Sequence, residues 1–189
     1  MIPPNILLGA YSIGYFPMAD ADNIISWFSP DPRTIIPLDE INIPRSTKQL
    51  ISKGIFSVKT DTSFESVIRG CAAREETWIN DEIIESYVEL HRLGYAHSVE
   101  SYDSDGLAGG LYGVALGSAF FGESMFSLRS GASKVALAFL IKHLAEKEFT
   151  LLDTQYITPH LKMFGATEIP RKRYIEQLRN AVVTEAEFG

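Results

Sequence analysis

The part of the sequence that most restricts the fold is AHSVESYDSDGLAGGLYGVALGSAFFGESMFS, residues 96–127. It contains two turn signals, Asp105-Gly106 and Gly117-Ser118, and apolar or aromatic runs flank each of them. Tight turns between such runs are typical of β-hairpins. The segment therefore predicts three antiparallel strands that lie side by side in one sheet.

A helix and a further strand are expected directly after these strands. Residues 133–148 place apolar side chains along one broad helical face, and FTLLDTQ, residues 149–155, has the composition of a buried strand. Strand, helix and strand in this order predict a right-handed parallel crossover. Upstream, the sequence predicts a strand at residues 55–59 and two helices at residues 61–72 and 80–94.

The first fifty residues are expected to form short pieces rather than long elements. A helix is predicted near residues 4–13, and SWFSPDPRTIIP, residues 26–37, then contains three prolines that break regular structure. Since a domain spans roughly 100–200 residues, the chain of 189 residues is long enough for one main domain with a small appendage. We assign the appendage to residues 1–50 and the main domain to residues 51–189.

Charge and composition limit the classes of partner. A net charge of −7 argues against nucleic-acid binding through a broad basic surface. A local basic strip stays possible, and its candidates are Arg129 with Lys134, and Lys162 with residues 171–173. The start of the chain lacks the basic residues of a signal peptide, and no apolar run has the length of a membrane span. We therefore expect a cytoplasmic protein without membrane contact.

Cysteine and histidine, which commonly bind metals, are few in this sequence and far apart. Cys71 is the single cysteine, which excludes an internal disulfide and a cysteine-rich metal site. The four histidines show no HExxH-type spacing. The sequence predicts no metal site.

Three polar residues interrupt strands that are otherwise apolar. Glu123 lies within FFGESMFS, and Asp153 and Gln155 lie within LLDTQ. If the two strands are parallel neighbours, all three residues lie toward the carboxyl ends, where open α/β sheets form their ligand crevice. Alternatively, Glu123 pairs with Lys134 or an arginine, and Asp153 caps the following turn. Taken together, the three residues indicate a functional site.

Seven motifs in order resemble one known family, and the resemblance covers roughly residues 8–178. The family is the bacterial leucyl/phenylalanyl-tRNA-protein transferases. The motifs are WFSPDPR (27–33), TWI (77–79), LGYAHSVE (93–100), GGLYGV (109–114), FFGESMFS (120–127), GASK (131–134) and LLDTQ (151–155). The resemblance implies a mixed α+β fold similar to GNAT-type acyltransferases, in agreement with the predicted element order. Many members are longer at the N-terminus, so residues 1–50 are expected to form a truncated small domain, and residues 51–189 the GNAT-like catalytic domain.

The activity implied by the resemblance is transfer of an amino acid to a protein. Leucine, phenylalanine or methionine would pass from charged tRNA, such as Leu-tRNA or Phe-tRNA, to a protein with N-terminal Arg or Lys, which creates an N-end rule degradation signal. The donor is an activated ester, so the reaction requires no cofactor and needs proximity, a neutral amine and oxyanion stabilisation. We expect a monomer.

The resemblance also implies roles for the three polar residues. Asp153 and Gln155 are implicated in activating the acceptor amine. A glutamine amide is too weak a base to take a proton, so we expect Gln155 to orient the amine and Asp153, a true base, to hold Gln155. Proton transfer through the tRNA ribose hydroxyl is an open alternative. Glu123 would face the cationic acceptor.

Further residues are expected to bind the charged tRNA end. By position within the family, the apolar donor pocket and its edge are expected to include Leu111, Phe120, Met125, Ser127, Leu140 and Leu144. Trp78 and Trp27 are placed to stack on the terminal adenosine. Arg129 and Lys134 are expected to bind tRNA phosphates, beside the start of the crossover helix.

Two other functions are compatible with the predicted fold. The first is an acyl-CoA-dependent N-acetyltransferase of the GNAT type, although the loop LRSGASK has one glycine instead of a glycine-rich pyrophosphate loop. The second is a non-catalytic module that binds protein N-termini. Retention of Glu123, Asp153 and Gln155 together argues against the second function.

Overall fold

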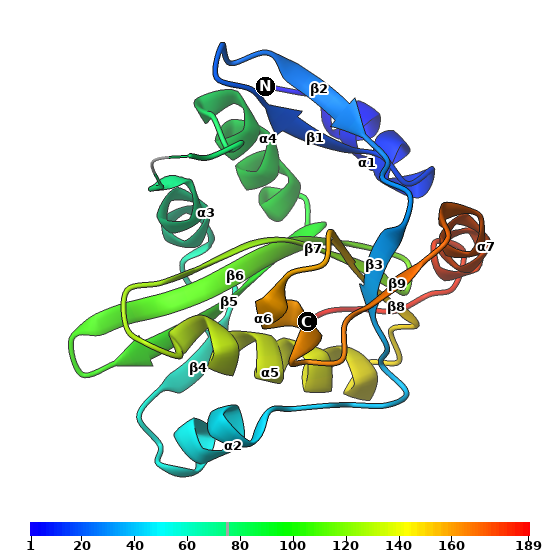
Figure 1. Cartoon of the computed structure of the whole chain (residues 1–189). Helices are drawn as coiled ribbons and strands as arrows, with labels where there is room; N and C mark the ends of the chain where they lie inside the picture. The colour runs from blue at the N-terminus through cyan, green and yellow to red at the C-terminus, as the bar shows by residue number, and fades with distance from the viewer. Residues whose placement is uncertain (75) are drawn as a thin grey trace.

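The structure is a computed structural model that describes residues 1–74 and 76–189. A seven-stranded mixed sheet in the order β4-β5-β6-β7-β8-β3-β9 forms its centre, and a separate two-stranded hairpin, β1-β2, lies beside it (Figure 1). The strands are β1 (Phe16–Ala19), β2 (Ile25–Phe28), β3 (Arg33–Ile36), β4 (Ser57–Thr60), β5 (Ala96–Asp103), β6 (Gly106–Leu116), β7 (Ala119–Ser127), β8 (Leu151–Gln155) and β9 (Thr167–Ile169). The helices are α1 (Pro4–Ser12), α2 (Arg45–Ser52), α3 (Phe64–Ala72), α4 (Asp81–Arg92), α5 (Ala132–Glu146), α6 (Pro159–Lys162) and α7 (Arg171–Ala181).

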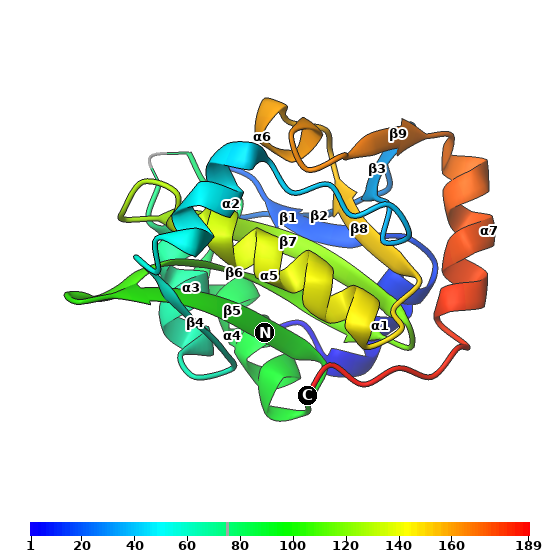
Figure 2. The same cartoon turned by 90° about the horizontal axis from the view of Figure 1, so that it is seen from below.

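Helices cover both faces of the large sheet. The crossover helix α5 runs along one face, where it contacts β5, β6 and β7 (Figure 2). On the opposite face, α3 packs on β6 and β7, α4 packs on β5, and α1 contacts β6 (Figure 1). The two faces hold two separate clusters of buried apolar side chains. The sheet is therefore the middle one of three layers, with helices packed on both of its faces.

The predicted hairpins and crossover are confirmed. Strands β5, β6 and β7 are antiparallel neighbours, and β7 pairs with β8 in parallel, with Phe121 opposite Asp153. Gly117 explains the tightness of the second turn, because its φ is +57° and an added Cβ would lie 2.5 Å from the carbonyl oxygen of Ala181. The order strand, two helices, three antiparallel strands, helix and strand is that of the GNAT-like fold which the resemblance implied.

The N-terminal region contains the short elements that were expected, but one of them has a role that the sequence did not predict. Strand β3 is inserted between β8 and β9 and is antiparallel to both. Pro32 and Pro37 flank this strand and leave its four residues free to pair. Residues far apart in the chain therefore meet at β8.

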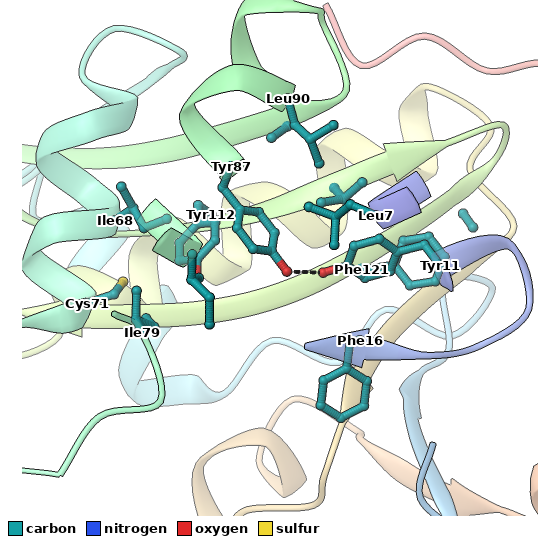
Figure 3. Packing of buried hydrophobic residues seen from close by; sticks show 14 of the residues in the cluster. Leu7, Tyr11, Phe16, Ile68, Cys71, Ile79, Tyr87, Leu90, Tyr112 and Phe121 are labelled. Carbon is teal, nitrogen blue, oxygen red and sulfur yellow. Dashed lines mark hydrogen bonds between the residues drawn. The ribbon is translucent and has the colours of Figure 1, made fainter. Parts of the chain in front are cut away.

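Two tyrosine hydroxyls meet inside the apolar core between α1, α4 and the sheet. Tyr11 of α1 and Tyr87 of α4 are fully or almost fully buried, and their hydroxyls are hydrogen-bonded to each other (Figure 3). Around them pack apolar side chains such as Leu7, Ile68 and Leu90, each worth about 1.5–3 kcal/mol when fully buried. The Tyr11 hydroxyl also contacts Glu123 of β7, a residue of the candidate site described below.

Within the described residues, no helix combines the length and the apolar character that crossing a membrane would require.

Candidate active site

The two parallel strands of the crossover separate at their carboxyl ends and leave a cavity. Their last paired residues are Phe121 and Asp153, whereas the pairing of β8 with β3 on its other side continues to Gln155. The cavity that opens beyond this point has a volume of about 480 Å³. Its lining comprises Arg74, Trp78, Leu111, Tyr112, Gly122, Glu123, Ser124, Met125, Ser133, Leu137, Leu140, Leu152, Thr154, Gln155, Tyr156, Thr158, His160 and Leu161.

Glu123 lies at this cavity within a network of hydroxyl and amide donors. Its Oε1 accepts hydrogen bonds from the Tyr11 hydroxyl at 2.7 Å and from Nε2 of Gln155 at 3.1 Å, and its Oε2 lies 3.3 Å from the Tyr87 hydroxyl, whose single hydrogen is directed to Tyr11 or to Glu123. Burial raises the pKa of Glu123 to about 7, and the hydrogen bond from Tyr11 opposes that rise. Glu123 can therefore exchange a proton near neutral pH.

Gln155 is fixed through both its backbone and its side chain. Its φ of +58° is unusual for a residue other than glycine, and Oδ1 of Asp153 accepts its backbone N–H at 2.9 Å. Its side-chain nitrogen donates to Glu123. Because the amide nitrogen is engaged in this way, the amide oxygen of Gln155 is the group that can accept a hydrogen bond from a ligand.

Asp153 is buried behind Gln155 and does not line the cavity. Its carboxylate accepts hydrogen bonds from Nε and Nη2 of Arg33 at 2.9 and 2.6 Å and from the Tyr174 hydroxyl at 2.7 Å. Arg33, itself fully buried, also donates to the carbonyl oxygen of Gly14 at 3.0 Å. Asp153 is thus engaged on both oxygens.

Some of the residues predicted for the donor pocket line this cavity, together with others that were not predicted. Leu111, Met125 and Leu140 line the cavity, as does Trp78. Leu137, Leu152 and Leu161 also line it and were not predicted. Their apolar character gave no signal, because a side chain in a pocket and one in a core look alike in sequence.

Four residues predicted to bind substrate lie outside the cavity lining. Phe120 and Leu144 are fully buried in the core beneath α5. Ser127 is hydrogen-bonded to Ser133, and Trp27 is 38% exposed on β2.

Arg129 and Lys134 lie at the start of α5, and a third cationic residue borders the cavity. Arg129 forms ion pairs with Asp103, at 3.2 Å, and with Asp105. Lys134 is half-buried in the first turn of α5. Arg74, which was not predicted, lines the cavity, donates to Ser124 Oγ at 2.9 Å and lies 5.7 Å from the ring centroid of Trp78.

His160 is the remaining titratable residue of the lining. Burial, together with the positive charge of Lys134, lowers its pKa, so its imidazole favours the neutral form. In the part of the chain that the structure describes, no group of three or more His, Cys, Asp or Glu side chains is arranged to hold a metal ion.

The mixed sheet holds an amide and a carboxylate at an apolar cavity where two of its strands separate, an arrangement consistent with the acyltransferase class. Residues 35–179 match the family described as leucyl/phenylalanyl-tRNA protein transferase, and residues 1–31 match the N-terminal domain of the same family. The chain therefore belongs to the leucyl/phenylalanyl-tRNA protein transferase family and is an aminoacyltransferase.

Relatives of this name match the chain over its whole length. A leucyl/phenylalanyl-tRNA--protein transferase of Chlorobaculum parvum is 49% identical over 193 residues, covering 100% of both chains. One of Rubrobacter xylanophilus is 48% identical over 189 residues, covering 100% of this chain and 99% of the relative. Among solved structures, L-PGS from Bacillus licheniformis has a TM-score of 0.48 and 9% identity, covering 79% of this chain and 56% of that chain.

Proposed function

We propose that the protein transfers leucine or phenylalanine from charged tRNA to the N-terminal Arg or Lys of an acceptor protein. The product is a new peptide bond and, in the N-end rule sense, a degradation signal. The observation that carries this proposal is an apolar cavity of about 480 Å³ that is bordered by the Glu123–Gln155 pair. Family membership supports the donor and acceptor classes.

The cavity suits an apolar donor side chain, either aliphatic or aromatic. Leucines and one methionine form its apolar wall, and methionine adapts to guests of different shape. A hydrophobic pocket discriminates by only about 1–3 kcal/mol per methylene. Tolerance of leucine, phenylalanine and methionine is the expected consequence.

The polar border suits an acceptor amine. In aminolysis, the amine nitrogen bonds to the ester carbonyl carbon, the bond from that carbon to the 3′ oxygen of tRNA breaks, and one amine proton ends on that oxygen. We assign Gln155 to orient the amine through its amide oxygen, and Glu123 to attract the cationic acceptor. Either Glu123, with its pKa near 7, or the ribose hydroxyl can carry the proton.

Asp153 supports this chemistry as a positioning residue in our proposal. Arg33 and Tyr174 engage its carboxylate, and its contact with Gln155 is through the Gln155 backbone N–H. The unusual φ of Gln155 is the conformation that this contact stabilises. Asp153 thereby acts on the amine through Gln155 instead of taking its proton.

The tRNA end is assigned to the rim of the cavity. Trp78 offers an aromatic ring for the terminal adenosine, and the guanidinium of Arg74 lies over one face of that ring. Lys134 is a better candidate for phosphate contact than Arg129, because two aspartates already neutralise Arg129. We propose that the protein acts as a cytoplasmic monomer.

The test is transfer of labelled leucine or phenylalanine from charged tRNA to a peptide that begins with Arg. A matched peptide that begins with Ala is the control for acceptor choice, and a parallel reaction contains acetyl-CoA instead of tRNA. We expect label on the Arg peptide alone. Acetylation from CoA without transfer from tRNA would overturn the proposal, and so would peptide binding without any transfer.

A further inference from the structure

One buried nitrogen at the cavity has no hydrogen-bond partner. Among the described residues, three buried side-chain polar atoms lack a partner: Thr34 Oγ1, Thr47 Oγ1 and His160 Nε2. Of these residues, His160 lines the cavity. Leaving such an atom unpaired costs about 1–3 kcal/mol. An unpaired donor or acceptor in a residue that lines a substrate cavity calls for an explanation, and a group of the bound substrate is the partner that we consider.

The local structure holds the imidazole in place. Helix α6 has only four residues, and it begins with Pro159 after Thr158, whose Oγ1 accepts the backbone N–H of Leu161 at 3.1 Å. The ring of His160 packs near Phe164, with ring centroids 5.5 Å apart. His160 follows β8 by five residues, so it borders the same cavity as Gln155, the last residue of that strand.

Lys134 gives the surroundings of His160 a positive potential. Burial is the larger cause of the lowered pKa of His160, and the positive charge of Lys134 adds to it by disfavouring protonation of the imidazole. Among the residues that the structure describes, Lys134 forms no ion pair within 4.0 Å. A positive potential that opposes an imidazolium stabilises an anion at the same place, because the sign of the interaction reverses with the sign of the charge.

The proposed reaction generates such an anion. When the amine nitrogen adds to the ester carbonyl, the π electrons of that bond move to the oxygen and produce a tetrahedral oxyanion. We assign Glu123 and Gln155 to the amine, and Nη2 of Arg74 is bonded to Ser124 Oγ and the Met125 carbonyl oxygen. The imidazole of His160 is an N–H donor at the same cavity that none of these contacts engages.

We propose that His160 is a further catalytic residue, which donates a hydrogen bond from Nε2 to the oxyanion formed from the ester carbonyl of bound aminoacyl-tRNA. This inference rests on the proposed function. The imidazole keeps its proton throughout. Collapse of the intermediate restores the carbonyl, breaks the bond to the 3′ oxygen and leaves the amine proton on that oxygen. A neutral imidazole serves this role well, since it donates a hydrogen bond without first having to be protonated.

The experiment compares binding of two stable analogues with catalysis in His160→Ala. One analogue joins leucine to adenosine through an amide and resembles the ground state; the other contains a tetrahedral phosphonate in place of the ester carbonyl. We expect kcat to fall about 10²–10³-fold. The phosphonate should lose affinity by a similar factor, whereas affinity for the amide analogue and KM for charged tRNA should stay nearly constant. His160→Gln, which keeps an N–H donor, should recover part of both losses.

Thr158→Ala is the matched structural control, because it removes the cap of α6 and keeps the imidazole. We expect it to weaken both analogues equally. The inference is overturned if His160→Ala also weakens both equally, or if its kcat stays close to that of the wild type. If the wild-type enzyme fails to label the Arg peptide, the proposed function falls, while the two analogues still decide whether His160 recognises a tetrahedral anion.

Discussion

At the scale of single residues, Glu123 makes stability depend on pH. Burial raises its pKa from 4.5 to about 7, so the folded protein keeps a proton between these values that the unfolded chain releases. The unfolding free energy should therefore fall as pH rises through this window, by at most about 1.4 kcal/mol per pH unit from this group. Glu123→Gln removes this contribution. Urea unfolding of both proteins at several pH values should show the variant gaining relative stability as pH rises, and parallel curves would contradict this.

The residue types in the sequence were enough to predict two carboxylates of the site, but not the residues that contact them. A carboxylate in an apolar strand is costly, which is why Glu123 and Asp153 could be found from sequence. The alternative that paired Glu123 with Lys134 or an arginine was wrong, since its partners are two tyrosines and Gln155. Tyr11 lies 112 residues from Glu123, and Arg33 lies 120 residues from Asp153. Nothing local to either residue indicates such a contact.

At the scale of elements, the helices and strands that could be predicted are those whose sequence signals lie within the element itself. The hairpins β5-β6-β7 and helix α5 were predicted because turn residues and helical periodicity lie within each segment. Strands β3 and β9 have four and three residues and were missed. Their conformation depends on pairing with each other and with β8, and a window of that size has no period to detect.

Helix α5 offers a comparison between two buried leucines, of which one borders the cavity. Leu140 and Leu144, one turn later, belong to the same buried cluster, but Leu140 also lines the cavity and Leu144 does not. We expect Leu140→Ala to enlarge the donor pocket and favour phenylalanine over leucine by about tenfold. Leu144→Ala should cost about 2–5 kcal/mol of stability and leave the donor ratio unchanged. The ratio of kcat/KM values for the two charged tRNAs, with urea unfolding, checks both outcomes. Equal shifts in donor ratio would mean that the helix does not divide pocket from core in this way.

At the scale of the whole molecule, one buried ion pair joins three distant parts of the chain. Arg33 and Gly14 come from the N-terminal region, Asp153 from the crossover and Tyr174 from α7. The aromatic rings of Phe16 and Tyr174 lie 4.9 and 4.5 Å from the guanidinium carbon of Arg33. The conformation of Gln155 thus depends on the assembly of the entire fold.

Asp153→Asn tests whether the ion pair between Arg33 and Asp153 supports transfer by stabilising the fold, or whether Asp153 takes part directly in the chemistry. The variant leaves the charge of Arg33 buried without its counter-ion, which should cost about 3–5 kcal/mol of unfolding free energy. Tyr174→Phe keeps the ion pair and removes one hydrogen bond, so its cost should be smaller, about 1–3 kcal/mol. Urea unfolding gives both values, and transfer rates are then expressed per folded molecule. If Asp153→Asn kept wild-type stability and still lost transfer, the carboxylate would act on the amine itself; stability and transfer falling together is the result expected of a residue that holds Gln155 in position.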